Sequence, residues 1–173
     1  PLPALMADYR TTTGERRWVA LDDGSRIQLN SASAIDTAFD KERRLVHLRQ
    51  GEILVNTGTD HRPFWVQTRD GYLRTLGTRL LVREEAQGTQ LAVQQGTVAV
   101  FANSHAGNAR QVLKPGEQVL FNRSGIRPVV GNGLDPWAWS DGVISAQAMR
   151  LDDFLAELAR YRNGLVRCSE AVA

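Results

Sequence analysis

Short segments in which every second residue is apolar follow one another from Arg16 to about Val130, and turn-forming residues end each segment. Residues 18–21 and 26–29 form the first pair, joined by Asp-Asp-Gly-Ser at 22–25. Asp-Gly between two alternating segments is a strong β-hairpin signal, because Gly readily adopts the positive φ of a tight turn. No helical stretch separates the segments, so a parallel α/β fold is excluded. We therefore predict an all-β fold.

The same hairpin pattern returns at residues 45–55, 91–100 and 111–121. Leu-Arg-Gln-Gly at 48–51 aligns with Val-Gln-Gln-Gly at 93–96, at an offset of 45 residues. This offset indicates an internal duplication, although two unrelated hairpins would give a similar short match. Repeated hairpins favour stacked antiparallel sheets, and a short solenoid of hairpins is the alternative architecture.

The pattern changes after a loop of Gly, Asn, Asp and Pro residues at 131–136. Beyond it, apolar residues recur at helical spacing and two aspartates occupy the expected first turn, which predicts one amphipathic helix of about 12 residues. We expect a β domain over residues 1–130, a linker over 131–139 and the start of a C-terminal module over 140–173. The apolar residues of the helix are Leu151, Phe154, Leu155, Leu158 and Tyr161.

The composition argues against several functions. The formal net charge is only +2, and the basic residues are scattered along the chain, so nucleic-acid binding is not expected. No segment reaches the roughly 18 to 20 apolar residues of a membrane span. The isolated histidines His47, His61 and His105 lack partners at metal-ligand spacing, and Cys168 is the only cysteine. We therefore expect no metal site, no cofactor and no internal disulfide.

One dipeptide carries a specific chemical hypothesis. Thr78 follows Gly77 at the expected start of a strand, and a Thr hydroxyl can attack the preceding carbonyl through a five-membered ring if the peptide is strained. The resulting ester would hydrolyse and cut the chain. Gly-Thr also occurs at 58–59, 88–89 and 96–97, so a glycine that merely lets the strand begin is the competing interpretation.

The four tryptophans fall into two groups. Trp18 and Trp65 lie in alternating segments and are predicted to be core residues. Trp137 and Trp139 follow the loop at 131–136, where they are either buried at a junction or exposed to a partner.

Several motifs, in the same order, resemble the FecR domain of sigma regulators, and together they cover nearly the whole chain. They are Tyr-Arg-Thr-Thr-Thr-Gly-Glu-Arg-Arg at 9–17, Val-Ala-Leu-Asp-Asp-Gly-Ser at 19–25, Arg-Pro-Phe-Trp-Val-Gln-Thr at 62–68, Leu-Gly-Thr at 76–78, and Leu-Lys-Pro-Gly-Glu-Gln at 113–118. Trp-Ser-Asp-Gly at 139–142 and the predicted helix resemble the segment C-terminal to that domain in iron-uptake regulators.

This resemblance implies the periplasmic part of a single-pass inner-membrane anti-sigma regulator whose membrane helix lies outside this chain. Such a region receives its signal from the signalling domain of a TonB-dependent outer-membrane siderophore transducer. A periplasmic protease takes part in the cascade, and a cytoplasmic segment controls an ECF sigma factor. The C-terminal module would be the incomplete start of a βαβ unit similar to the secretin and TonB short N-terminal domain. A FecR-like scaffold or cell-wall-associated domain without a sigma partner is the alternative.

The resemblance also implies site residues. Some family members are cut between the Gly and Thr that match Gly77 and Thr78, whereas an enzyme acting on a diffusible substrate is not expected. A leucine-rich stretch regarded as part of the transducer contact matches Leu151, Leu155, Leu158 and Leu165, and packing inside the module is the alternative role. The full set of expected partner-binding residues is Leu151, Phe154, Leu155, Leu158, Tyr161, Leu165, Trp137 and Trp139.

Overall fold

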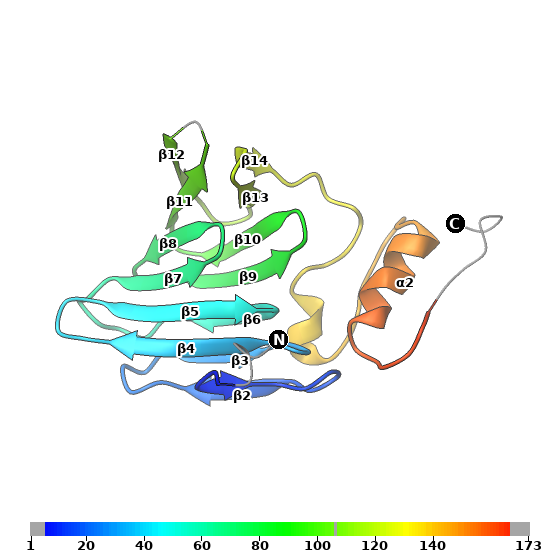
Figure 1. The fold of residues 1–173 in the computed structure, drawn as a ribbon, viewed down its shortest axis with the longest axis horizontal. Coiled ribbons are helices and arrows are strands. Elements are labelled where there is room, and N and C mark those ends of the chain that lie inside the picture. Colours follow the sequence, from blue (N-terminus) through cyan, green and yellow to red (C-terminus); the bar gives the residue numbers. More distant parts are fainter. Residues whose placement is uncertain (1–5, 106, 167–173) are drawn as a thin grey trace.

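The computed structural model describes residues 6–105 and 107–166 and contains two seven-stranded β-sheets packed face to face (Figure 1). Sheet A has the strand order β1-β4-β5-β7-β8-β11-β12, and sheet B has the order β14-β13-β10-β9-β6-β3-β2. Neighbouring strands are antiparallel except β5 and β7, which are parallel. The predicted all-β class with stacked sheets is confirmed.

The strands are short and follow the alternating segments of the sequence. Their bounds are β1 Tyr9–Arg10, β2 Arg17–Ala20, β3 Arg26–Leu29, β4 Ala34–Phe39, β5 Arg44–Gln50, β6 Glu52–Asn56, β7 Phe64–Thr68, β8 Gly71–Thr75, β9 Arg79–Glu85, β10 Gly88–Gln95, β11 Val98–Ser104, β12 Gly107–Leu113, β13 Gln118–Asn122 and β14 Gly125–Pro128.

The main core lies between the two sheets. Successive side chains of a strand point to opposite faces, so every second residue enters this core. Val46 and Leu48 of β5 in sheet A, for example, belong to the same buried cluster as Ile53 and Val55 of β6 in sheet B. Each fully buried aliphatic or phenyl side chain contributes about 1.5–3 kcal/mol, which makes this layer the principal source of stability.

The prediction that Trp18 and Trp65 are core residues is wrong. Their neighbours Val19, Phe64 and Val66 are buried in the core, so alternation directs both indoles to the outer faces. Trp18 is 44% exposed, and the Arg26 guanidinium lies over its ring. Trp65 packs beside Tyr72 and Phe101 on the outer face of sheet A, and its ring lies below the Arg74 guanidinium. An alternating pattern identifies two faces, but it does not say which one turns inward.

The internal duplication is confirmed for the central strands. The β4–β5 pair aligns Ala34 with Gln50 and Ile35 with Leu48, with an irregularity between these two pairs. The β9–β10 pair repeats this register and irregularity 45 residues later, with Arg79 opposite Gln95 and Leu80 opposite Val93. After each pair the chain crosses to the other sheet, at Gly51 between β5 and β6 and at Gly96 between β10 and β11.

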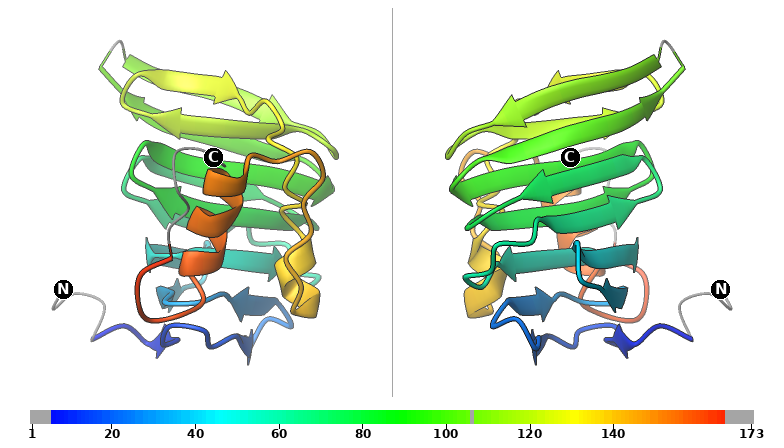
Figure 2. Two further views of the ribbon diagram at one scale, coloured as in Figure 1. Left: turned by 90° about the vertical axis from the view of Figure 1, so that its right-hand side faces the viewer. Right: turned by 90° about the vertical axis from the view of Figure 1, so that its left-hand side faces the viewer.

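The C-terminal segment covers part of the outer face of sheet B. It contains the 3-10 helix η1 (Ala138–Asp141) and the helix α2 (Leu151–Ala159), both seen in front of the strands in Figure 2, left. The helix has 9 residues, fewer than predicted, because the segment from Arg160 to Gly164 forms turns. No helix in the described residues is long and apolar enough to span a membrane. The boundary at residue 140 between two modules stays a prediction.

Candidate functional site

Gly77 and Thr78 lie where the chain crosses from sheet A to sheet B, between β8 and β9. Gly77 has a φ of +62°, and no atom lies within 4 Å of the place where a Cβ would stand. Glycine is therefore favoured here by the left-handed backbone and not by a lack of space. Leu76 beside it is 54% exposed, whereas Thr78 is only 5% exposed. The crossover thus presents one face to solvent and buries the side chain on its C-terminal side.

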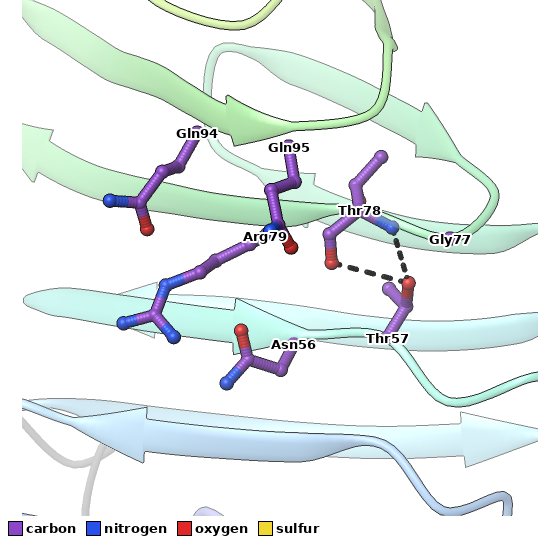
Figure 3. Close-up of a pocket in the computed structure, with 7 residues that line it drawn as sticks. All are labelled: Asn56, Thr57, Gly77, Thr78, Arg79, Gln94 and Gln95. Carbon is purple, nitrogen blue, oxygen red and sulfur yellow. Dashed lines mark hydrogen bonds between the residues drawn. The ribbon is translucent and has the colours of Figure 1, made fainter.

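Thr57 holds the backbone of Thr78 on both sides (Figure 3). The Thr78 N–H donates to Thr57 Oγ1 at 2.7 Å, and the Thr57 N–H donates to the Thr78 carbonyl at 3.0 Å. The Thr57 hydroxyl is also 3.3 Å from the same carbonyl oxygen. These contacts fix the nitrogen atom that would leave in an attack on the Gly77 carbonyl.

The Thr78 hydroxyl lies in a small chain of polar groups. Its oxygen is 2.7 Å from Thr75 Oγ1, and Thr75 Oγ1 is 3.0 Å from the carbonyl oxygen of Thr97. A carbonyl can only accept, so a Thr75 proton directed to Thr97 leaves Thr75 Oγ1 free to accept the proton of Thr78. The arrangement can therefore orient Thr78 Oγ1 and draw its proton away from the preceding carbonyl.

The crossover at Gly96, between β10 and β11, packs against the crossover at Gly77 and Thr78. A Cβ on Gly96 would lie 2.5 Å from Thr78 Cγ2 and 2.7 Å from the Gly77 carbonyl oxygen, so only glycine fits without displacing that peptide. Beside it is an open depression of about 720 Å³ that admits water to the Gly77–Thr78 bond. Its lining residues are Asn56, Thr57, Gly77, Thr78, Arg79, Gln94 and Gln95.

Asp60 is the carboxylate on the other side of Gly77, where it lines a second depression of about 370 Å³ together with His61. Hydrogen bonds from the Arg62 guanidinium and the Arg62 N–H hold the pKa of Asp60 well below its usual range. A carboxylate with so low a pKa is a poor general base at neutral pH. In the described residues no group of three His, Cys, Asp or Glu side chains could hold a metal ion.

The outer face of sheet B carries three of the residues expected to bind a partner: Trp137, Trp139 and Tyr161. Trp139 is only 5% exposed and packs on Leu54, Leu81 and Ala92, which point away from the main core. Trp137 and Tyr161 are half-buried against the same cluster. These aromatic side chains attach the C-terminal segment to the sheet.

A buried polar network completes this attachment. Arg160 Nη2 donates to Glu52 Oε2 at 2.5 Å and Nη1 pairs with Glu157, while Arg83 Nη1 reaches Glu157 Oε2 at 3.0 Å. Asn30 Nδ2 donates to Glu52 Oε2 and to the Tyr161 hydroxyl, both at 2.8 Å. We refer to Asn30, Glu52, Arg83, Glu157, Arg160 and Tyr161 as the C-terminal clamp.

The clamp shifts the pKa values of Arg160 and Tyr161. Burial opposes the charge of Arg160, but Glu52 and Glu157 outweigh it and raise the pKa of Arg160 above its ordinary value. Burial raises the pKa of Tyr161, so its phenol stays protonated well into the alkaline range. Arg160 therefore keeps its charge, and Tyr161 its phenol proton, throughout the neutral pH range.

The expected leucine-rich contact is arranged differently from the aromatic residues. Leu151 is 42% exposed and Leu165 is 75% exposed, whereas Phe154, Leu155 and Leu158 are half-buried. In the part of the chain that the structure describes, none of these five joins either buried apolar cluster. Their role in partner binding stays a prediction. Cys168 lies outside the described residues.

The FecR protein family matches residues 7–99, which include β1 to β10 and both residues of the Gly77–Thr78 bond. This chain belongs to the FecR family. The FecR match covers more than half of the sequence, and it ends just inside β11.

Two crystal structures of a "putative anti-sigma factor" from Parabacteroides distasonis have a similar fold to this FecR-family chain. One is 25% identical with a TM-score of 0.72, and the similarity covers 90% of this chain and 74% of that one. The other is 24% identical with a TM-score of 0.72, over 88% and 73% of the two chains, and it supports the fold alone. No curated protein matches this chain.

Most of the supporting residues of this FecR-family chain were not identified from the sequence. Thr57, Thr75, Glu52 and Arg160 belong to no short motif. Thr57, Glu52 and Arg160 have partners far away along the chain, whereas Thr75 contacts both the nearby Thr78 and the distant Thr97.

Proposed function

We propose that this FecR-family chain is the periplasmic signal-receiving region of a transmembrane anti-sigma regulator. In this proposal it binds the signalling domain of a TonB-dependent siderophore transducer and thereby controls an ECF sigma factor, with a periplasmic protease acting in the same cascade. The family and the similarity to an anti-sigma factor support the general class. The transducer, the siderophore signal and the periplasmic location are parts of the proposal.

One observation carries the partner-binding part of the proposal. The clamp holds α2 to sheet B through Glu157, Arg160 and Tyr161, while the apolar residues of the helix stay outside both buried clusters. An amphipathic helix held by its polar side has an apolar side available for another surface. A helix-in-groove contact or an added strand beside it would both suit a protein partner.

The experiment is a calorimetric titration with the signalling domain of a TonB-dependent siderophore transducer from the same organism. Replacing both Leu155 and Leu158 by Ala should weaken binding by about 2 kcal/mol or more if these side chains are central anchors. Val112→Ala is the control, because Val112 is 53% exposed on strand β12 of sheet A, whereas α2 lies on the outer face of sheet B. Wild-type affinity in the double variant would contradict this site. Absence of binding by the wild type would favour the scaffold interpretation.

The second proposed activity is self-cleavage between Gly77 and Thr78. Thr78 Oγ1 attacks the Gly77 carbonyl carbon, the C–N bond breaks, and the hydroxyl proton ends on the Thr78 nitrogen. Water then hydrolyses the ester and leaves a Gly77 carboxylate, a free Thr78 amine and the restored hydroxyl. The left-handed Gly77 and the contacts from Thr57 and Thr75 to Thr78 support this step.

Intact mass spectrometry under denaturing conditions tests the self-cleavage. Wild-type protein should give two fragments whose masses sum to the full chain plus one water, ending at Gly77 and beginning at Thr78. Thr78→Ala should remain whole, whereas Thr78→Ser and Thr78→Cys should retain some cutting because they keep a nucleophile. A folded wild-type protein that stays at the full-length mass after long incubation would rule the activity out.

A further inference from the structure

The first half of the domain contains a second copy of the crossover around Gly77 and Thr78. Ala32 has a φ of +51°, where Gly77 has +62°. The N–H of the next residue, Ser33, donates to Thr11 Oγ1 at 2.9 Å, and the Thr11 N–H donates to the Ser33 carbonyl at 2.9 Å. Thr57 makes the same pair of bonds with Thr78. The two crossovers therefore share the same pair of backbone hydrogen bonds to a threonine.

The equivalence extends to the glycines that cover the two sites. A Cβ on Gly51 would lie 2.7 Å from Ser33 Cα, and one on Gly96 would lie 3.2 Å from Thr78 Cα. The preceding residue is a glutamine in both cases, opposite Ala34 in the first half and opposite Arg79 in the second. Gln50 and Gln95 thus occupy the same position relative to their crossovers.

Gln50 shows what a glutamine at this position can reach. Its Nε2 donates to the carbonyl oxygen of Ala32 at 2.9 Å. The carbonyl oxygen of Ala32 corresponds to that of Gly77, which is the oxygen that gains negative charge when Thr78 attacks. Gln95 is exposed and lines the same depression as Gly77 and Thr78, and Figure 3 shows it at the end of β10, with Gln94 before it on the same strand.

We propose that Gln95 is a catalytic residue of the self-cleavage, a role that rests on the proposed cutting of the Gly77–Thr78 bond. Its side-chain amide donates a hydrogen bond to the Gly77 carbonyl oxygen as the tetrahedral intermediate forms. This contact stabilises the developing negative charge in the manner of an oxyanion-hole donor. The proton of the Thr78 hydroxyl still ends on the Thr78 nitrogen, and Gln95 is unchanged at the end.

The equivalent bond in the first half, between Ala32 and Ser33, shows the geometry of the site but is not expected to be cut. Ser33 is 1% exposed, and its hydroxyl accepts the Glu52 N–H at 2.9 Å. Thr78 lies beside an open depression, so water can reach an ester formed there. Hydrolysis of the ester needs that water, so cutting is expected at Gly77–Thr78 and not at Ala32–Ser33.

The experiment measures the rate of cutting in chains synthesised in a cell-free system, where the protein is whole at the start. Gln95→Glu keeps the shape of the side chain but removes the donor at neutral pH, and it should slow cutting at Gly77–Thr78 by about tenfold or more. Gln95→Ala should have a similar effect, and Gln95→Lys, which restores a donor, should recover part of the rate. Gln94→Ala is the matched control, because Gln94 lines the same depression as Gln95. Gln50→Ala is the control in the other half of the domain.

The outcomes separate this inference from the activity on which it depends. If the wild type is cut and both Gln95→Glu and Gln95→Ala are cut at the wild-type rate, Gln95 has no catalytic role but self-cleavage stands. If the wild type is never cut, even when hydroxylamine is added to trap an ester, both proposals are wrong. An equal slowing in Gln95→Lys, Gln95→Glu and Gln94→Ala would mean that any change to the lining of the depression slows cutting. It would also overturn the role of Gln95.

Discussion

Arg160 and Glu52 are 108 residues apart in the sequence, and their side chains meet across 2.5 Å on the outer face of sheet B. The Glu52 side chain is only 3% exposed, whereas that of Arg160 is 22% exposed. Removing either partner therefore has unequal consequences. A buried carboxylate that loses its cation stays unpaired, but an arginine at the rim can turn toward water or remain with Glu157.

We predict that Arg160→Met lowers the free energy of unfolding by about 3 kcal/mol, and that Glu52→Gln lowers it by clearly less. The double variant should resemble Glu52→Gln, because the unpaired charge is then gone. Urea denaturation of the three variants measures these differences. Equal losses in the two single variants would show that the pair is solvated and that burial of Glu52 is unimportant.

The contact between the two crossovers predicts an unusually sensitive glycine. Gly96→Ala places a methyl group against Thr78 and the Gly77 carbonyl, so it should destabilise the fold by about 2–4 kcal/mol. Gly116→Ala is the matched control, since Gly116 also has positive φ but no atom within 4 Å of a Cβ. It should cost only about 1 kcal/mol. Thermal unfolding of both variants distinguishes packing from backbone strain, and similar losses would contradict the close approach.

The hydroxyl of Thr57 should matter for both stability and cutting. Thr57→Val leaves the Thr78 N–H without its acceptor and should cost about 1–2 kcal/mol, while it slows cleavage because the leaving nitrogen is no longer fixed. Thr11→Val removes the equivalent bond in the first half and should cost a similar amount without changing the rate of cutting. Denaturation and timed mass spectrometry check the two effects. Equal cleavage rates in both variants would contradict a positioning role for Thr57.

A buried ion pair between Asp23 and Arg44 should make the fold sensitive to acid. Both side chains are fully buried and their Oδ2 and Nη1 atoms are 2.7 Å apart. Burial opposes the charge of Asp23, but hydrogen bonds from Ser25 and Arg44 outweigh it and hold the pKa of Asp23 below its ordinary value of 3.8. A lowered folded-state pKa gives stability that is complete above the unfolded pKa and is lost as the pH falls through the folded pKa.

At neutral pH we expect Asp23→Asn to lose about 3–5 kcal/mol, because Arg44 keeps a buried charge without its carboxylate. The difference between this variant and the wild type should narrow as the pH falls below about 3.8, where the wild-type carboxylate also becomes protonated. Urea denaturation at a series of acidic pH values measures the gap. A gap that stays constant with pH would mean that Asp23 acts through shape alone.

The sequence predicted the strands well because alternation and turn residues are local signals. It did not predict the parallel contact between β5 and β7, since pairing of distant strands depends on the path of the chain between them. The outward positions of Trp18 and Trp65 were missed because an alternating pattern has two equivalent phases. The buried neighbours Val19 and Val66 decide the phase, and they are less conspicuous than tryptophan.

The candidate sites were predicted only at their most recognisable residues. Gly77 and Thr78 stood out through chemistry and resemblance, whereas Thr57 is an ordinary threonine until the fold brings it to Thr78. Thr75 is close to Thr78 in the sequence, but only the turn between β8 and β9 brings the two hydroxyls together. The C-terminal clamp left no local signal either. Its charges come from β6, β9 and the end of α2, and such a combination is defined only by the tertiary structure.

The position of the Gly77–Thr78 bond also has a mechanical consequence. Residues before it supply β1 to β8, and residues after it supply β9 to α2, so within the described residues sheet A divides between β8 and β11 and sheet B between β6 and β9. Sheet A is thereby split into five strands and two, and sheet B into three and four. The division in one sheet is therefore offset from the division in the other. A chain cut at this bond would keep its shape at rest, because the strand pairs β8–β11 and β6–β9 hold the two parts together. Under tension the same chain would peel into two pieces, whereas an uncut chain would have to unravel before its ends could part.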